Sequence, residues 1–260
     1  MKDSSIVDAA EKNNSQIVVR DLKIAFGSFV LMHDVNFTVS KGDVFIIMGG
    51  SGCGKSTLLR TMIGLKEPSQ GQILYTGTSF WETEPEARNK VMQRFGILYQ
   101  QGALWSSMTL AENVALPLGE YTSLKPGQIE ELASLKLALV GLAGFEAYFP
   151  SEISGGMRKR AALARAMALD PEFLFLDEPS AGLDPVSSRL LDDLILELRE
   201  SLGTTFVVVT HELASIFAIA NNSIYLDVET RTMTSHGDPK KLLEASDDPK
   251  VLKFLTRGEK

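Results

Sequence analysis

The most constraining stretch of this chain is a run of nine residues, Gly49 to Thr57, four of which are glycine. The run reads Gly-Gly-Ser-Gly-Cys-Gly-Lys-Ser-Thr and fits the phosphate-loop pattern G-x-x-x-x-G-K-[ST] at every fixed position. The mostly apolar run at residues 43–48 predicts a buried strand before the loop, and the pattern of residues 57–63 predicts a helix after it. This order predicts a nucleotide-binding α/β protein; the alternative is a glycine-rich turn with a chance lysine.

The residue types in the loop explain how it would hold phosphate. Glycines let the backbone take turns that a Cβ would block, so that successive N–H groups converge on one anion. Lys55 adds a mobile positive charge for the outer phosphates, and the Ser56 hydroxyl is a suitable ligand for Mg²⁺.

Composition limits the classes of function. The 260 residues carry a net charge of −7, which argues against non-specific binding to nucleic acid. Cys53 is the only cysteine, so an internal disulfide is excluded and a reducing cytoplasm is favoured. The first 16 residues lack the apolar core of a signal peptide, and no apolar run reaches the length of a membrane span. We therefore expect a soluble chain whose membrane role comes through partners.

Apolar runs before the loop predict a second, smaller sheet. Residues 17–26, 29–32 and 35–39 predict short strands, which suggest an antiparallel sheet beside a parallel core. At the ends of the chain, the polar residues 1–15 predict a mobile tail, and the amphipathic residues 248–260 predict a tail suited to docking.

The middle of the chain is predicted to be helical. Residues 109–150 predict helices separated by loops at 117–119 and 125–127. We interpret about 99–160 as a helical subdomain inserted into a nucleotide-binding domain that covers 16–247.

Two acids follow a fully apolar strand. Phe173 to Leu176 predict a buried parallel strand, and Asp177 and Glu178 come directly after it. Parallel sheets bind ligands at the carboxyl ends of their strands, so we expect both acids at the phosphate site. Asp177 can hold the Mg²⁺ shell, and Glu178 can polarise a water aimed at the γ-phosphate. His211 follows the next buried strand and can contact the same phosphate, although a single histidine is more often structural.

Two further residues are candidates with open alternatives. Gln100 ends a predicted strand, and its amide can bind Mg²⁺ or the attacking water; alone, it would be a solvated loop residue. Phe26 precedes a glycine and can stack on an adenine face; an ordinary strand core residue is equally compatible with the pattern.

The segment Ser154-Gly155-Gly156 precedes a strong helix. Ser154 lies where an N-cap would, and three cations follow it, at residues 158–160. Positive charge there opposes the helix macrodipole, which suggests that a phosphate arrives at this end. A capped helix with a solvated basic face is the alternative.

The motifs occur in an order that resembles the nucleotide-binding subunit of ABC transporters. They are an aromatic residue, the phosphate loop, a glutamine after a strand, Ser-Gly-Gly, an apolar strand ending in Asp-Glu, Ser-Ala-Gly-Leu-Asp and a strand followed by His. The resemblance covers about residues 17–245. It implies a P-loop NTPase fold: a RecA-like, mostly parallel sheet with flanking helices, an antiparallel β subdomain and an inserted α-helical subdomain.

The resemblance also implies roles. The protein would be an ATPase that uses ATP and Mg²⁺, with Glu178 as the catalytic base, His211 as the switch histidine and Lys55 on the phosphates. Metal ligands would be Ser56, Gln100 and Asp177. Residues that contact the nucleotide would be Phe26, Gly49, Gly50, Ser51, Gly52, Cys53, Gly54, Lys55, Ser56, Thr57, Gln100, Asp177 and, across a homodimer, the signature residues Ser154, Gly155 and Gly156.

The signature departs from the usual form, because Met157 stands where most importers of this family carry glutamine. Methionine cannot offer the hydrogen bonds of an amide. The form Ser-Gly-Gly-Met-Arg-Lys-Arg is similar to the lipid-transporting branch, which includes the ATPase of the Mla phospholipid system. That resemblance implies integral membrane permease subunits, an additional lipid-binding subunit and a place on the cytoplasmic face of the inner membrane. Alternatives are an ABC importer ATPase for another small solute, or a non-transport ABC ATPase such as a cluster-assembly factor.

Overall fold

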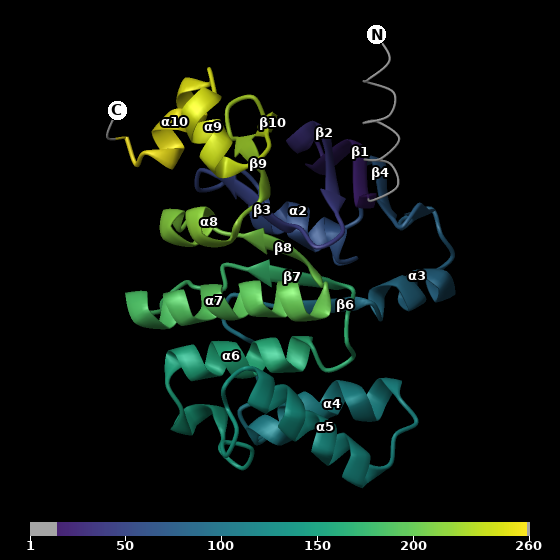
Figure 1. Cartoon of the computed structure of the whole chain (residues 1–260). Coiled ribbons are helices and arrows are strands. Elements are labelled where there is room, and N and C mark those ends of the chain that lie inside the picture. The colour runs from purple at the N-terminus through teal and green to yellow at the C-terminus, as the bar shows by residue number, and fades with distance from the viewer. Residues whose placement is uncertain (1–14, 259–260) are drawn as a thin grey trace, which may run out of the picture.

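The structure, a computed structural model, describes residues 15–258. Its centre is a sheet that has six strands within that range, in the order β10-β9-β3-β8-β7-β6 (Figure 1). Five of them run parallel, and β10 pairs antiparallel with β9 at one edge. Their bounds are Val44–Gly49 (β3), Phe95–Leu98 (β6), Phe173–Asp177 (β7), Thr205–Val209 (β8), Asn222–Asp227 (β9) and Thr232–His236 (β10).

The central strands are buried on both faces, which is why their sequences are continuously apolar. Along β7, Leu174 and Leu176 point to the core shared with the helical subdomain, whereas Phe173 and Phe175 point to the core shared with the smaller sheet. Strands β3 and β8 alternate in the same way. The sheet is therefore held between two hydrophobic layers, and its strand ends are fixed in position.

The smaller sheet is antiparallel and has the order β2-β1-β4-β5. Its strands are β1 (Ser15–Phe26), β2 (Phe29–Ser40), β4 (Gln70–Tyr75) and β5 (Thr78–Ser79). The prediction of two separate strands at 29–32 and 35–39 was wrong, because β2 is continuous. Its pairing with β1 shifts register between Val19 and Leu22, and Asp21 and Asp34 take positive φ angles of 47° and 51°. A local irregularity, and not a turn, interrupts the apolar alternation.

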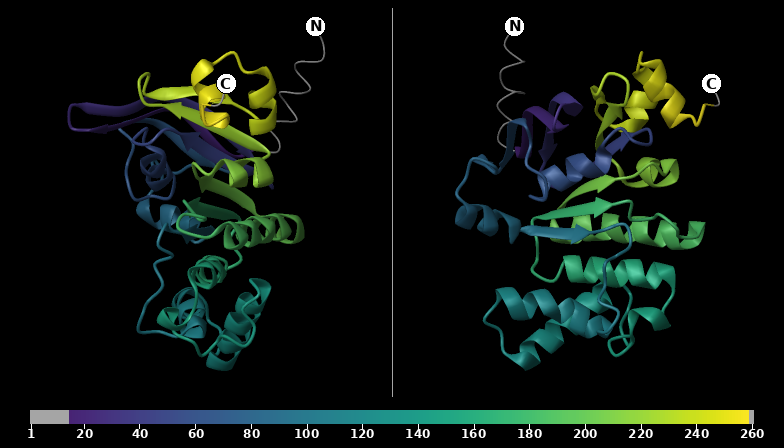
Figure 2. Two further views of the ribbon diagram at one scale, coloured as in Figure 1. Left: turned by 90° about the vertical axis from the view of Figure 1, so that its left-hand side faces the viewer. Right: turned by 180° about the vertical axis from the view of Figure 1, so that it is seen from behind.

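The helical subdomain lies at the far side of the sheet from the antiparallel strands (Figure 2). It contains α4 (Leu110–Tyr121), α5 (Pro126–Leu139), the short helix η1 (Pro150–Glu152) and α6 (Gly155–Ala166). The predicted loop at 117–119 was wrong, since α4 continues through Pro117. A capping box between Thr109 and Glu112 and the buried residues Leu110, Val114 and Leu118 hold the helix despite the missing N–H.

Helix α6 is packed closely on the sheet through a glycine. A Cβ at Gly96 of β6 would lie 2.2 Å from the carbonyl oxygen of Ala166 and 2.5 Å from Leu174. Only glycine allows this approach. The carboxyl end of α6 is thus held directly on an edge strand, while its amino end, at Gly155, lies at the other end of the helix.

The remaining helices complete the layers: α2 (Lys55–Met62), α3 (Pro85–Met92), α7 (Pro185–Leu202), α8 (Leu213–Ile219), α9 (Pro239–Ala245) and α10 (Pro249–Leu255). None of the helices in residues 15–258 combines the length and apolarity needed to span a membrane.

The predicted tail 248–260 packs on its own chain where the structure describes it. Val251 and Leu255 of α10 are buried in the core shared with the helical subdomain, and Phe254 packs against Tyr225. Lys250 Nζ donates to Asp227 Oδ2 at 2.7 Å, and this contact lowers the pKa of Asp227 to about 2. The apolar face of this helix is therefore already covered. Of the predicted tail 1–15, residues 1–14 lie outside the described residues, and Ser15 begins β1.

Candidate nucleotide-binding site

The phosphate loop joins β3 to α2, as the sequence predicts. A Cβ at Gly49 would lie 2.5 Å from the carbonyl oxygen of Leu226 and 2.7 Å from Cys53 Sγ, so no side chain fits there. Lys55 Nζ donates to the carbonyl oxygens of Gly49 at 2.9 Å and Gly50 at 3.0 Å. Within residues 15–258, no side chain caps α2, so the N–H groups of its first turn are available to an anion.

Cys53 is buried beneath the loop, with 5% of its surface exposed. Burial raises the pKa of its thiol, and the charge of Lys55 opposes the rise. Its side chain fills the space under Gly49 and is a packing group in this structure.

Ser56 and Asp177 meet at the carboxyl end of β7. The Ser56 hydroxyl donates to Asp177 Oδ1 at 3.0 Å, which links the first turn of α2 to the strand that carries the acids. A hydroxyl and a carboxylate in contact, both partly exposed, are hard oxygen ligands and fit Mg²⁺. Gln100 is exposed in the turn after β6, and its side chain makes no hydrogen bond to either residue in the described part of the chain.

Glu178 and His211 form the second contact at this edge of the sheet. Glu178 follows β7 with a φ of 48°, and its N–H donates to the carbonyl oxygen of Val209 at 2.8 Å. Glu178 Oε1 lies 2.8 Å from His211 Nδ1. Glu178 Oε2 is buried and has no hydrogen-bond partner within residues 15–258. A buried carboxylate oxygen without a donor needs one, and a water molecule can provide it.

Phe26 lies at the end of β1 and is 52% exposed. Lys66 Nζ lies 4.7 Å from the centroid of its ring. The alternative of an ordinary core residue is therefore wrong, because the ring is not in the core. An exposed aromatic face with a cation beside it suits the stacking of a base.

Ser154 caps α6, as predicted, by accepting a hydrogen bond from the N–H of Met157 at 3.2 Å. Ser154 is exposed, whereas the side chain of Met157 is partly buried and packs against the core shared with the helical subdomain. The methionine that departs from the usual signature thus contributes apolar packing in place of an amide.

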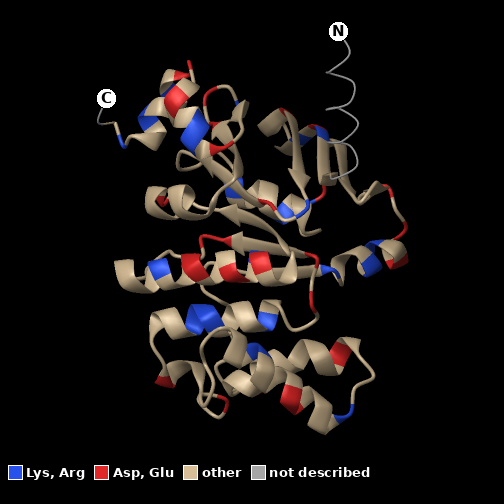
Figure 3. Cartoon of the chain, viewed as in Figure 1, with Lys and Arg blue, Asp and Glu red and all other residues tan. Residues whose placement is uncertain are grey.

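The cations that follow Ser154 make contacts that neither interpretation of the sequence predicted. Lys and Arg gather on α6 (Figure 3), and they donate to backbone carbonyls. Arg158 and Arg160 each contact two carbonyl oxygens between α5 and α6, and Lys159 contacts the carbonyl oxygens of Gln100 and Glu178. The acceptors for the arginines are Val140, Gly141, Pro150 and Ile153. Each of the three cations thus has backbone partners within its own chain.

The sequence did not indicate that Gly156 of the signature lies against the first turn of α7. A Cβ at Gly156 would lie 3.0 Å from Ser187 Oγ in the first turn of α7. Asp184 caps that helix by accepting hydrogen bonds from the N–H groups of Val186 and Ser187 at 3.0 Å each. The motif Ser-Ala-Gly-Leu-Asp was the available signal, because its Asp-Pro ending predicts a helix cap.

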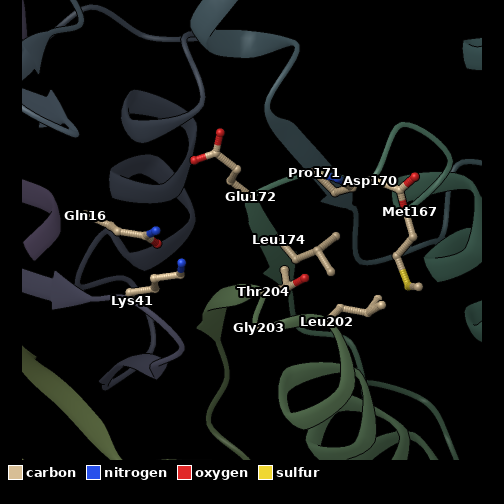
Figure 4. A pocket seen from close by; sticks show the side chains of 10 residues that line it. All are labelled: Gln16, Lys41, Met167, Asp170, Pro171, Glu172, Leu174, Leu202, Gly203 and Thr204. Atoms are coloured by element: carbon tan, nitrogen blue, oxygen red, sulfur yellow. The ribbon is translucent and has the colours of Figure 1, made fainter. Parts of the chain in front are cut away.

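A cavity of about 290 Å³ lies at the amino ends of the central strands, opposite the strand ends that carry the candidate site (Figure 4). Glu172 and Leu174 line it at the start of β7, and Gly203 and Thr204 line it just before β8. It lies at the amino ends of these strands and contains none of the predicted site residues, so it is separate from the nucleotide site.

The chain is similar to a known family and to several known proteins. The profile described as "ABC transporter" matches residues 32–181. The chain belongs to the ABC transporter family. It is 41% identical over 239 residues to the "Probable ribonucleotide transport ATP-binding protein mkl" of Mycobacterium tuberculosis, covering 92% of this chain and 66% of that protein. It is 39% identical over 247 residues to the "Intermembrane phospholipid transport system ATP-binding protein MlaF" of Haemophilus influenzae, covering 95% and 92%.

Solved structures of ABC proteins share this fold. CbiO1 from Clostridium perfringens, described as part of the ABC transporter complex cbiONQ, has a TM-score of 0.82 and 25% identity, covering 90% of this chain and 92% of its own. The dimeric ATP-binding cassette MJ0796, bound to ADP and Pi, has a TM-score of 0.75 and 27% identity, covering 85% and 98%. The predicted family, the P-loop NTPase fold and the ATPase class of this ABC chain are confirmed.

Proposed function

We propose that this ABC ATPase powers phospholipid transport through a partner permease. The observation that carries the proposal is the match to MlaF, which extends over 95% of this chain and 92% of the relative. By contrast, the chain spans 66% of the length of the mycobacterial mkl relative. An alignment that covers nearly all of both proteins supports a shared role more strongly than one that leaves a third of a relative unmatched.

The proposed chemistry assigns each side chain a task. Lys55 and the loop N–H groups bind the β- and γ-phosphates, and Phe26 stacks on the base. Mg²⁺, held by Ser56 and Asp177 and approached by Gln100, would neutralise charge on the phosphates when bound. Glu178 accepts a hydrogen bond from the attacking water at its unpaired Oε2, and His211 holds the other carboxylate oxygen. The contacts Ser56–Asp177 and Glu178–His211 support this assignment.

A homodimer and a membrane partner are part of the proposal. Ser154 and the two signature glycines lie at the exposed start of α6, where they would contact ATP bound to the other copy; the dimeric MJ0796 structure supports such pairing. A hollow of about 800 Å³ between α3, the turn after β6 and α4 would receive a helix of the permease. Its lining includes the exposed side chains of Met92, Tyr99, Leu116 and Tyr121. We also propose an additional lipid-binding subunit and a place on the cytoplasmic face of the inner membrane, because the chain is similar to MlaF.

Transport by the native complex tests the proposal. The tagged chain is purified from its own membranes in mild detergent and reconstituted into vesicles of phosphatidylethanolamine and phosphatidylglycerol that contain a fluorescent phospholipid. We expect ATP-dependent movement of the probe with the wild-type chain and none with Glu178→Gln. ATP turnover without any movement of phospholipid, in a complex that retains its membrane subunits, would contradict the lipid assignment.

Ribonucleotide transport is the second candidate, because the mkl relatives carry that name at 41% identity. The same vesicles, loaded with radiolabelled ribonucleotide in place of the lipid probe, separate the two functions. Uptake or release of ribonucleotide that depends on ATP, with no effect on the phospholipid probe, would favour this candidate.

A further inference from the structure

Lys159 is a buried cation whose side chain donates to two backbone carbonyls outside its own helix. It belongs to the second turn of α6, and 7% of its surface is exposed. Its Nζ donates to the carbonyl oxygen of Gln100 and, at 3.3 Å, to the carbonyl oxygen of Glu178. One ammonium group therefore joins three segments that are far apart in the sequence: α6, the turn after β6 and the end of β7.

Both acceptors belong to residues of the proposed nucleotide site. Glu178 takes a positive φ of 48°, which is unfavourable for a residue with a Cβ, so its backbone must be held from outside. The N–H of Glu178 is held by Val209, and its carbonyl oxygen is held by Lys159 and by the N–H of Ala181. A shift of Lys159 would therefore alter the backbone from which the Glu178 carboxylate extends.

Two other groups of contacts show that this arrangement is specific to Lys159. The second buried lysine, Lys136 of α5, forms an ion pair with the exposed Asp170. The neighbouring cations on α6, Arg158 and Arg160, donate to carbonyls within the helical subdomain. Of these cations, Lys159 is the one that connects α6 to the proposed catalytic residue.

Charge supports the same connection. Burial lowers the pKa of Lys159, and the carboxylates of Glu178 and Asp177 oppose that change by favouring the ammonium form.

We propose that Lys159 is a positioning residue that couples the signature end of α6 to Glu178 of the same chain. Ser154, which the proposed function places on the ATP of the partner copy, begins the helix that carries Lys159. Phosphate binding at Ser154 moves or fixes α6, and Lys159 transfers that constraint to the carbonyl of Glu178. The two ATP sites of the dimer are thereby coupled through each chain. The inference rests on the proposed dimer and the proposed role of Glu178, and it does not depend on the transported substrate.

The test compares Lys159→Met, which keeps the length of the side chain but removes its donors, with Lys159→Arg, which keeps them. We expect kcat for ATP to fall about 10- to 100-fold in Lys159→Met, with KM within about twofold and a Hill coefficient that falls towards one. Lys159→Arg should recover most of kcat. In a Glu178→Gln background, Lys159→Met should still dimerise with Mg-ATP, because the nucleotide contacts remain.

Lys136→Met is the matched control, since it removes the other buried lysine of the helical subdomain; its kcat and Hill coefficient should stay at wild-type values. The inference is overturned if Lys159→Met keeps wild-type kcat and cooperativity, if it loses Mg-ATP binding, or if Lys136→Met loses as much activity. Should Lys159→Met fail to fold, Lys159→Gln decides: its shorter amide reaches at most one carbonyl, and normal turnover and cooperativity would overturn the coupling.

These results separate the inference from the proposed function. Failure of phospholipid transport with intact wild-type turnover contradicts the transport assignment alone. A wild-type enzyme that hydrolyses ATP with a Hill coefficient of one contradicts the coupling alone.

Discussion

The phosphate loop and the start of α6 both suit a phosphate group, but they are built differently. At the loop, side chains from separate elements contact one another: Ser56 meets Asp177, and Glu178 meets His211. At the start of α6, the Ser154 hydroxyl contacts the N–H of its own helix. The first region combines side chains from α2 and from the ends of β7 and β8, whereas the second is built around the amino end of a single helix. The difference supports the proposal that one chain holds most of the groups for the reaction and a separate, exposed surface for the phosphate of a partner copy.

The largest expected effect tests the first region. Glu178→Gln removes the carboxylate that would accept the proton of the attacking water, so ATP turnover should fall by at least about 100-fold while Mg-ATP stays bound. Steady-state hydrolysis and equilibrium binding of a fluorescent ATP measure the two effects. Lys55→Ala is the contrasting variant, because losing a charged hydrogen bond to phosphate should weaken binding about 10- to 100-fold. Wild-type hydrolysis by Glu178→Gln would show that this region lacks the assigned base.

The next effect tests the second region. Ser154→Ala removes a donor to phosphate without touching the loop, so kcat should fall about 10-fold and the ATP affinity of the isolated chain should stay unchanged. Thr109→Ala is a matched control, because Thr109 caps α4 as Ser154 caps α6. It should lower the melting temperature by a similar amount and leave kcat unchanged. Equal losses of turnover in both variants would mean that Ser154 acts as a helix cap only.

The smallest effect concerns the scaffold that the two regions share. Asp192 of α7 is buried, and Ser215 of α8 donates to its Oδ2 at 2.9 Å. Burial raises the pKa of Asp192 from 3.8 to about 6. Between these values the folded state holds a proton that the unfolded state releases, so the free energy of unfolding falls as pH rises through 6.

Asp192→Asn keeps the acceptor and removes the charge. It should raise the melting temperature at pH 8 by about 3–6 °C, with no difference at pH 4 and no change in kcat. The neighbouring, half-exposed Asp193 pairs with Arg189 at 3.0 Å on the surface, and Asp193→Asn should shift the melting temperature little at either pH. A change of kcat in Asp192→Asn would show that α7 and α8, and not Lys159, connect the two regions.

The sequence predicted the first region well because its chemistry is local. The fixed spacing from Gly49 to Thr57 determines the loop, and an apolar strand that ends in Asp177 and Glu178 places both acids at the same edge of the sheet. The sequence also predicted Glu178 and His211 at the same ends of the strands, since neighbouring parallel strands end together, but it did not predict their direct contact.

The rest of the site depends on packing that no pattern encodes. The sequence presents Arg158, Lys159 and Arg160 as one basic run, yet each side chain reaches different carbonyls. Pro117 argues for a loop, and packing of the residues on either side of it overrides that preference. Long-range contacts of this kind appear only when the elements are placed in space.

Gly96 has a mechanical consequence for α6. Because the carbonyl of Ala166 rests on this glycine, a rotation of the helix would pivot about its carboxyl end. At a rise of 1.5 Å per residue, Ser154 lies about 18 Å from that pivot and Lys159 about 10 Å. If Ser154 were displaced by such a rotation, Lys159 would move somewhat more than half as far. A large movement at Ser154 would therefore become a smaller one beside Glu178. A bulkier residue at position 96 would displace the carboxyl end of the helix and change the point about which it turns.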